Sequence, residues 1–356
     1  MTLLLLPLIA LAVLAAGLAG ASGPLLLTAA GAALIGAVMA AVHHAEVVAH
    51  RMGEPFGTLV LALAVTVIEV ALILSMMLAG GAGAADKAAL PRDTLFAAVM
   101  IIANGVVGIC LLLGGLRHRE QSFRVEGTGS GLAALVALST LTLVLPTFTT
   151  SSPEGTYTTS QLVFAAASSL VLWSVFVFIQ TVRHRDYFLP ATDVHDENQH
   201  AAPPTNARAA ASFGALLVAL VAVVGLAKLL SPSIEAAVTA ARAPKAVVGI
   251  LIALIVLLPE TWAAVRAARA NRLQTSLNLA FGSALASIGL TIPAVVAAAV
   301  WFQLPLTLGL EAKDMALLAL TFVVGAITLG SGRTNMMQGA VHLVIFAAFL
   351  FLALVP

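Results

Sequence analysis

Two acidic residues lie inside long apolar runs of the sequence. Glu69 is in the middle of the run 57–80, and Glu260 is past the middle of the run 245–268. A carboxylate near the centre of a bilayer costs at least about 2.5–3.5 kcal/mol on insertion scales, a cost that a leucine would avoid. A carboxyl group that only hydrogen-bonds to a neighbouring helix is the structural alternative. Because the feature occurs in both halves of the chain, we favour a functional pair.

The apolar run after each glutamate also carries polar side chains. Asn104 is in the middle of the run 94–116, and Ser283 is in the run 275–301. Amides and hydroxyls in membrane helices often serve only to hydrogen-bond neighbouring helices. Their position directly after the two acidic runs makes Asn104 and Ser283 candidate site residues as well.

Carboxylate, amide and hydroxyl groups together offer oxygen ligands to a hard cation. Ca²⁺ takes about six to eight oxygens, of which Glu69 and Glu260 can supply up to about four. Backbone carbonyls near Thr66 and Pro259 could supply others, because proline cannot donate the usual helix hydrogen bond. Softer metals are disfavoured, since no His or Cys accompanies the glutamates. A cation and protons that compete for these carboxylates, exposed alternately to each side of a membrane, would give antiport.

A separate group of titratable residues lies in the segment AVHHAEVVAHRMGEPFG, which contains His43, His44 and Glu54. Imidazoles that titrate near neutral pH could form a proton-sensing gate, and a solvated polar helix end is the alternative. The order HHAEVVAH differs from the HExxH motif of metalloproteases, and no nucleophile elbow, Walker loop or dinucleotide fingerprint is present. We therefore predict no catalytic residue and do not expect an enzyme.

Composition identifies the elements that must hold these residues. Of the 356 residues, 61% are hydrophobic and 9% are charged, against about 25% charged in a soluble domain. This excludes a soluble enzyme or a nucleic-acid-binding protein and predicts an all-α polytopic membrane protein with about 11 transmembrane helices. The single cysteine, Cys110, excludes an internal disulfide framework. The predicted helices cover residues 2–21, 25–48, 57–80, 94–116, 130–147, 160–182, 210–230, 245–268, 275–301, 314–331 and 335–355.

A polar stretch, residues 183–209, divides the chain into two halves. We expect it to be a cytoplasmic linker, with a regulatory cation sensor as the alternative. Residues 1–24 would form an extra N-terminal transmembrane helix, and residues 25–182 and 210–356 would each form a five-helix repeat. Because five is odd, the second repeat must begin on the opposite side of the membrane. The two repeats would then have inverted topology, as in many transporters.

Basic residues are distributed unevenly between the loops. Eleven of the 17 lysines and arginines follow even-numbered helices, and six lie in the other loops. Positive charge is enriched in cytoplasmic loops, so the N-terminus is predicted to be cytoplasmic and the C-terminus to be outside. A signal peptide begins with positively charged residues, but no Lys or Arg precedes Leu3. The first helix is therefore expected to be retained.

Three segments resemble bacterial calcium/sodium–proton antiporters of the ChaA type, which are CAX-like members of the calcium/cation antiporter superfamily. They are GEPFGTLVLALAVTVIEVALI, PRDTLFAAVMIIANGVVGICLLLGGLRHREQ and LIALIVLLPETWAAVRAARANRLQTSLNLAFGSALASIGLTIP. The resemblance implies a protein of the bacterial cytoplasmic membrane, with one extra helix before two inverted five-helix repeats. It implies an ion site with two glutamates, bends beside them and polar residues on the following helices. The residues so implicated are Glu69, Glu260, Thr66, Pro259, Asn104 and Ser283.

The favoured hypothesis is secondary active export of Ca²⁺ in exchange for H⁺. Export of Na⁺ or K⁺ in exchange for H⁺ at the same site is the alternative. A channel is disfavoured, because inverted repeats with carboxylates near the midplane suit alternating access. No cofactor and no nucleic-acid partner are expected; the expected partners are the transported ions and the lipid bilayer.

Overall fold

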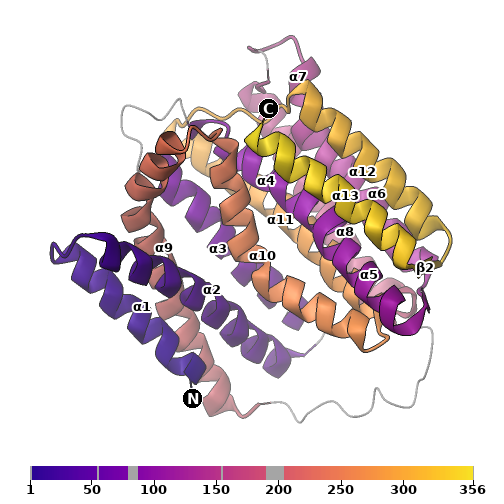
Figure 1. Cartoon of the computed structure of the whole chain (residues 1–356), viewed down its shortest axis with the longest axis horizontal. Helices are drawn as coiled ribbons and strands as arrows, with labels where there is room; N and C mark the ends of the chain where they lie inside the picture. Colours follow the sequence, from indigo (N-terminus) through magenta and orange to yellow (C-terminus); the bar gives the residue numbers. More distant parts are fainter. Residues whose placement is uncertain (1, 54–55, 79–86, 154, 190–203, 356) are drawn as a thin grey trace. The chain divides into compact units, whose positions relative to one another are not determined.

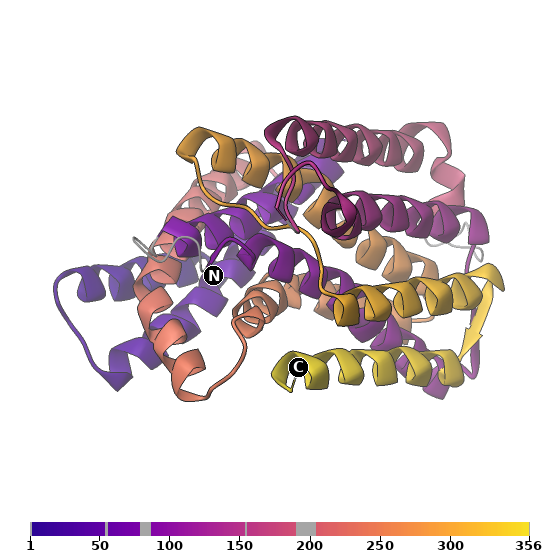
Figure 2. The ribbon, with the colours of Figure 1, turned by 90° about the horizontal axis from the view of Figure 1, so that it is seen from above.

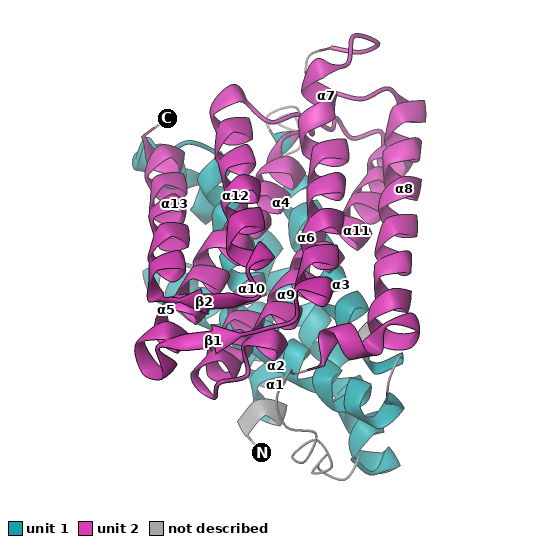
Figure 3. Cartoon of the chain, turned by 90° about the vertical axis from the view of Figure 1, so that its right-hand side faces the viewer, with its two compact units in different colours: residues 1–87, 195–256 teal, residues 88–194, 257–356 magenta. Residues whose placement is uncertain are grey.

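The computed structural model describes residues 2–53, 56–78, 87–153, 155–189 and 204–355, and most of these residues are helical (Figure 1). Within those ranges, 10 helices are long and apolar enough to cross a membrane, and the first apolar run forms a shorter helix. The predicted class of an all-α polytopic membrane protein is confirmed. Its helices divide between two compact units, which Figure 3 colours separately.

Unit 1 comprises Met1–Lys87 and His195–Val256. In this unit α2 packs against α1, α3 and α9. Alanines such as Ala37 on α2 and Ala222 on α9 are fully buried, and small side chains of this kind let membrane helices approach closely. The helices are α1 (Thr2–Leu18), α2 (Pro24–Met52), α3 (Phe56–Leu78), α9 (Asn206–Ala240) and the first part of α10 (Ala246–Arg269).

Unit 2 comprises Ala88–Val194 and Leu257–Pro356. Here α11 packs against α6 and α8, and α13 packs against α5. The elements are the end of α10, α4 (Leu90–Met100), η2 (Ile101–Val106), α5 (Val107–His118), β1 (Glu120–Ser122), α6 (Val125–Ser139), η3 (Thr140–Val144), α7 (Leu145–Phe148), α8 (Thr159–Phe178), η4 (Ile179–Arg183), η5 (Arg185–Phe188), α11 (Leu273–Phe302), α12 (Ala312–Gly330), β2 (Arg333–Asn335) and α13 (Met336–Leu354).

A short two-stranded sheet sets the position of α13 against α5. β1 pairs antiparallel with β2, with Gln121 opposite Thr334, and β2 joins the neighbouring helices α12 and α13 (Figure 2). Beyond the sheet the two helices are in close contact, because a Cβ added at Gly108 would lie 3.1 Å from Cβ of His342 and one at Gly339 would meet the backbone of Leu112. The sheet and the glycines thus bring His342 onto α5.

Several helix boundaries differ from those predicted, and the largest difference is at the end of α9, which continues to Ala240 and not to residue 230. The helical segment α6–η3–α7 runs over Val125–Phe148 and is longer than the predicted 130–147. Helix α9 begins at Asn206 and not at residue 210, because the Thr205 hydroxyl caps it by accepting a hydrogen bond from the Arg208 amide at 3.3 Å.

The described start of the predicted linker packs against helices of unit 2. Its first described residues form the end of η4 and all of η5. Phe188 is buried and its ring contacts Phe176 edge to face. The Asn278 amide donates to the Phe188 carbonyl at 2.5 Å. The polar composition of this segment gave no indication of these tertiary contacts. Residues 190–203 of the linker lie outside the described residues.

One end of unit 2 gathers the turns that follow α5, α10 and α12. The His118 ring bonds to the carbonyl of Arg269 at 3.1 Å, and the Gln121 amide donates to the carbonyl of Ala268 at 3.0 Å. We predict from the charge count that this end faces the cytoplasm. The arginines in the last turns of these helices and in the segments that follow them are Arg117, Arg119, Arg124, Arg266, Arg269, Arg272 and Arg333.

The units do not coincide with the halves of the sequence. Helices α2 and α3 of the first half share unit 1 with α9 of the second half, and α4 to α8 share unit 2 with α11 to α13. The inverted relationship between residues 25–182 and 210–356 stays a prediction.

Candidate functional site

Glu69 is buried in unit 1, with only 1% of its surface exposed. It lies on α3 three residues after Thr66, so the two side chains share one face of the helix. The Thr66 hydroxyl donates its proton to the Ala62 carbonyl at 2.9 Å, and the lone pairs of its oxygen can still bind a cation. A buried carboxylate with a hydroxyl one turn away can therefore offer several oxygens.

Glu260 lies on α10 in unit 2, directly after Pro259. Helix α10 continues through this proline, where the resemblance implies a bend. Proline removes one hydrogen bond, and the bonds around it are enough to maintain the helix. The carbonyl of Ile255, four residues earlier, is left without its usual amide donor. The glutamate itself is half-buried. The helix turn before it therefore offers a free carbonyl acceptor within a membrane-spanning helix.

Ser283 belongs to a line of hydroxyls along one face of α11. Ser287 and Thr291 follow it at intervals of one turn, and both are buried. The Ser283 oxygen is buried and has no hydrogen-bond partner among the residues that the structure describes. An unsatisfied buried hydroxyl costs about 1–3 kcal/mol, so its oxygen is a ready ligand for a cation or water.

Asn104 is fully buried at the centre of the π-helical turn η2, a distortion that is frequent at functional sites. Its amide nitrogen donates to the Thr321 hydroxyl at 2.9 Å, and its side-chain oxygen lies 3.1 Å from Nδ1 of His342. The Thr321 hydroxyl donates to the Leu317 carbonyl at 2.7 Å, so it must accept from Asn104. The amide is therefore oriented by α12 and α13, and its oxygen keeps one lone pair for a further partner.

His342 completes this network and was missed by the sequence analysis. Its Nε2 atom lies 3.1 Å from the Thr328 hydroxyl. Because the Asn104 oxygen needs a donor, Nδ1 of His342 carries the proton and Nε2 accepts from Thr328. The residues of the contact between Asn104 and His342 are 238 positions apart in the chain. The available signal was a lone histidine in the apolar run 335–355, which lies far from both glutamates in the sequence.

We expect His342→Ala to lower the stability of the protein, because the Asn104 oxygen and the Thr328 hydroxyl would be left buried without a partner. Each such group costs about 1–3 kcal/mol, which thermal unfolding of the purified protein in detergent would register as a lower Tm. His342→Asn places an amide donor near the position of Nδ1 and should recover part of the loss. Val344→Ala, at a position 69% exposed on the same helix, is the matched control. An unchanged Tm for His342→Ala would contradict a stabilising network.

The candidate gate residues lie at the end of α2 in unit 1. His44 is buried and its Nδ1 atom is 3.3 Å from the Ser212 hydroxyl on α9, whereas His43 is half-buried and meets the His44 ring edge to face. The Arg51 guanidinium donates to the Asn206 side chain at 2.7 Å, so this end of α2 is tied to the start of α9. Glu54 lies outside the described residues. A gating role of these residues stays a prediction.

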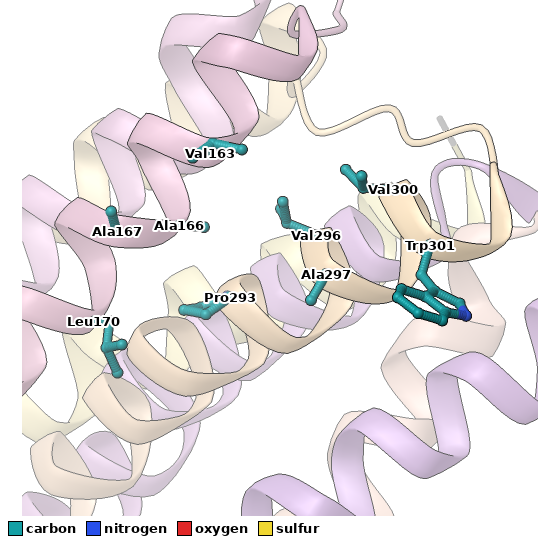
Figure 4. Close-up of a pocket in the computed structure, with 9 residues that line it drawn as sticks. All are labelled: Val163, Ala166, Ala167, Leu170, Pro293, Val296, Ala297, Val300 and Trp301. Atoms are coloured by element: carbon teal, nitrogen blue, oxygen red, sulfur yellow. The ribbon is translucent and has the colours of Figure 1, made fainter.

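A large pocket in unit 2 is unsuited to a cation. It measures about 670 Å³ and lies between α8 and α11, where Figure 4 shows the side chains of Val163, Leu170 and Trp301 along its walls. Each described residue that lines it has an apolar side chain or an indole ring, so these side chains offer no oxygen ligand to a cation.

The candidate residues fall in both units. Thr66 and Glu69 lie together on α3 of unit 1. The others lie on separate elements of unit 2: Pro259 and Glu260 on α10, Ser283 on α11 and Asn104 on η2. Within the described ranges, no cluster of three His, Cys, Asp or Glu side chains has the geometry to hold a metal.

Comparisons with known proteins agree on one family. The family model described as sodium/calcium exchanger protein matches residues 22–182 and 211–355. The chain is 52% identical to the putative ionic transporter y4hA of Sinorhizobium fredii, over 91% of this chain and 87% of that protein. It is 36% identical to the sodium-potassium/proton antiporter ChaA of Escherichia coli, over 89% of this chain and 86% of that protein.

A solved structure shares the fold. The crystal structure of the H⁺/Ca²⁺ exchanger CAX superposes with a TM-score of 0.72 and 14% identity, over 98% of this chain and 87% of that chain. The predicted resemblance to the calcium/cation antiporter superfamily is confirmed by the family model and by the relative at 36% identity.

Proposed function

This chain belongs to the sodium/calcium exchanger protein family, and from that membership we propose that it exports Ca²⁺ from the cytoplasm in exchange for H⁺. Relatives in the family are ion antiporters, and the ten long apolar helices among the described residues make the chain a multi-pass membrane protein. The proposal specifies the transported ion and the residues that bind it. In the proposed cycle, Glu69 and Glu260 bind Ca²⁺ on one side of the membrane and protons on the other.

The observation that carries this proposal is the burial of Glu69. A carboxylate with 1% exposure in an apolar membrane helix is costly, and uptake of a proton or binding of a cation lowers that cost. A buried group that can take up either of two exchangeable cations is the element that antiport needs. The hydroxyl of Thr66 and the unpartnered oxygen of Ser283 support a site with oxygen ligands.

Exchange of Na⁺ or K⁺ for H⁺ is the second candidate, and one observation favours it. The Escherichia coli relative at 36% identity is named a sodium-potassium/proton antiporter. A monovalent ion needs fewer ligands and less negative charge than Ca²⁺, so the same glutamates could serve it.

Proton flux in everted membrane vesicles distinguishes these candidates. Vesicles that contain the protein are acidified inside by respiration, and Ca²⁺, Na⁺ or K⁺ is then added separately while an internal pH dye is monitored. We expect Ca²⁺ to raise the internal pH, because its uptake into the everted vesicle releases protons. A response to Na⁺ or K⁺ alone would replace the Ca²⁺ proposal with the second candidate. Ca²⁺ accumulation that persists after a protonophore is added would contradict exchange with protons altogether.

A further inference from the structure

A basic pocket lies between the ends of α5 and α10 in unit 2. Its volume is about 310 Å³. It opens at the arginine-rich end of the unit, which we predict to face the cytoplasm. The residues that line it are Arg117, Trp262, Val265, Arg266, Arg269 and Ala270.

The charge of this pocket is not balanced by acidic side chains. Among the residues that the structure describes, no carboxylate lines it, and none of their salt bridges involves Arg117, Arg266 or Arg269. Two helix C-termini meet here, and each contributes about half a negative charge. Three arginines against two such dipoles leave a surplus of about two positive charges, which calls for an anionic ligand.

The pocket is held by hydrogen bonds that do not consume its guanidinium groups. The His118 ring bonds to the Arg269 carbonyl at 3.1 Å. The Gln121 amide bonds to the Ala268 carbonyl and to the Asn271 side chain, each at 3.0 Å. These contacts fix the end of α10 against α5 and β1 through backbone and amide groups. The arginine side chains are exposed and remain available to a ligand.

Along α10, the apolar groups of the pocket lie nearer the middle of the span and the basic groups lie nearer its end. Trp262, Val265, Arg266 and Arg269 share one face at helical spacing, and the Trp262 side chain is 68% exposed. Tryptophan is enriched at the membrane interface, where its ring lies at the level of the headgroups. Trp262 lies one turn before Arg266, toward the apolar part of the span. A ligand in this pocket therefore meets guanidinium groups at its polar end and an indole ring beside its apolar part.

We propose that the pocket formed by Arg117, Trp262, Arg266 and Arg269 binds the phosphate group of an anionic phospholipid. Arginine binds phosphate oxygens through paired hydrogen bonds, and basic pockets between transmembrane helices hold such headgroups. The acyl chains lie along Trp262 and Val265. A lipid with two phosphodiester groups, such as cardiolipin, matches the surplus charge better than phosphatidylglycerol, which carries one.

Lipid binding to the purified full-length protein in detergent tests the proposal. Native mass spectrometry would compare titrations with cardiolipin, phosphatidylglycerol and phosphatidylcholine. The test variant replaces Arg117, Arg266 and Arg269 with Gln. The matched control replaces Arg119, Arg272 and Arg333 with Gln, which removes the same charge from exposed positions at the same end of the unit but outside the pocket.

We expect the test variant to bind cardiolipin about a hundredfold more weakly than the unmodified protein, because each basic group near an anionic surface contributes about a factor of five. The control should change binding little, and phosphatidylcholine should bind weakly to all three proteins. Equal losses in test and control variants would indicate general surface charge and overturn the proposal, as would equal binding of phosphatidylcholine. Displacement of cardiolipin by inorganic phosphate would assign the pocket to a soluble anion instead.

Indole fluorescence gives a second measurement. Brominated acyl chains quench nearby tryptophans, so brominated phosphatidylglycerol should quench the unmodified protein more than Trp262→Phe. Equal quenching of both proteins would remove the apolar part of the proposed site. These measurements report lipid binding alone, so their failure would leave the proposed exchange activity standing.

Discussion

Glu69→Gln and Glu260→Gln are each expected to reduce Ca²⁺-driven proton flux to the background of vesicles without the protein. Glutamine keeps the size and much of the hydrogen bonding of glutamate, but it carries no negative charge and takes up no proton. Both steps of the proposed cycle would therefore fail. The measurement is the internal pH of everted vesicles after addition of Ca²⁺, normalised to the amount of protein in the membrane.

The control for this experiment is Glu120→Gln, because Glu120 is a surface carboxylate whose side chain is 57% exposed and pairs with Arg333. Such a surface pair contributes about 0–1 kcal/mol, so the control should exchange ions normally. Glu69→Asp keeps the charge but shortens the side chain, and we expect it to retain part of the flux. Wild-type flux in Glu69→Gln or Glu260→Gln would exclude that residue as an ion ligand.

The second large effect is the dependence of Ca²⁺ affinity on pH. If two carboxyl groups are protonated in the absence of Ca²⁺ and both must lose their protons to bind it, binding releases about two protons. Apparent affinity should then fall by about a hundredfold for each pH unit below the pKa values of the pair. Initial rates of Ca²⁺ uptake into proteoliposomes, measured at several pH values on the binding side, would give this slope. A slope of zero would contradict competition for one site.

The same titration separates the carboxylates from the candidate gate. A histidine gate acts by opening or closing access, so replacing His43 and His44 with Gln should shift the pH midpoint and leave the slope and the maximal rate unchanged. An unchanged midpoint would leave the two histidines as polar residues of a helix end, where His44 is satisfied by Ser212.

Hydropathy and residue type were enough to predict the class of the protein and its candidate acidic residues. Apolar runs of membrane-spanning length leave no other fold class, because backbone groups in a bilayer must be satisfied within helices. Carboxylates such as Glu69 are conspicuous in those runs, since burial of a charge has a large cost. The segments around Glu69, Asn104 and Glu260 also carried the resemblance to the antiporter superfamily, which the comparisons confirm.

Which polar groups meet depends on the packing of helices that are distant in the sequence. The contact between Asn104 and His342 joins helices 238 residues apart, and it depends on the β1–β2 pairing and the close approach at Gly108. Neither feature leaves a periodic signal, because hydrophobic periodicity reports which face of a helix is buried and not which helix covers it. The arginines at the ends of α5 and α10 were visible in the sequence as an orientation signal. Their convergence with Trp262 into a pocket required those two helix ends to be packed together.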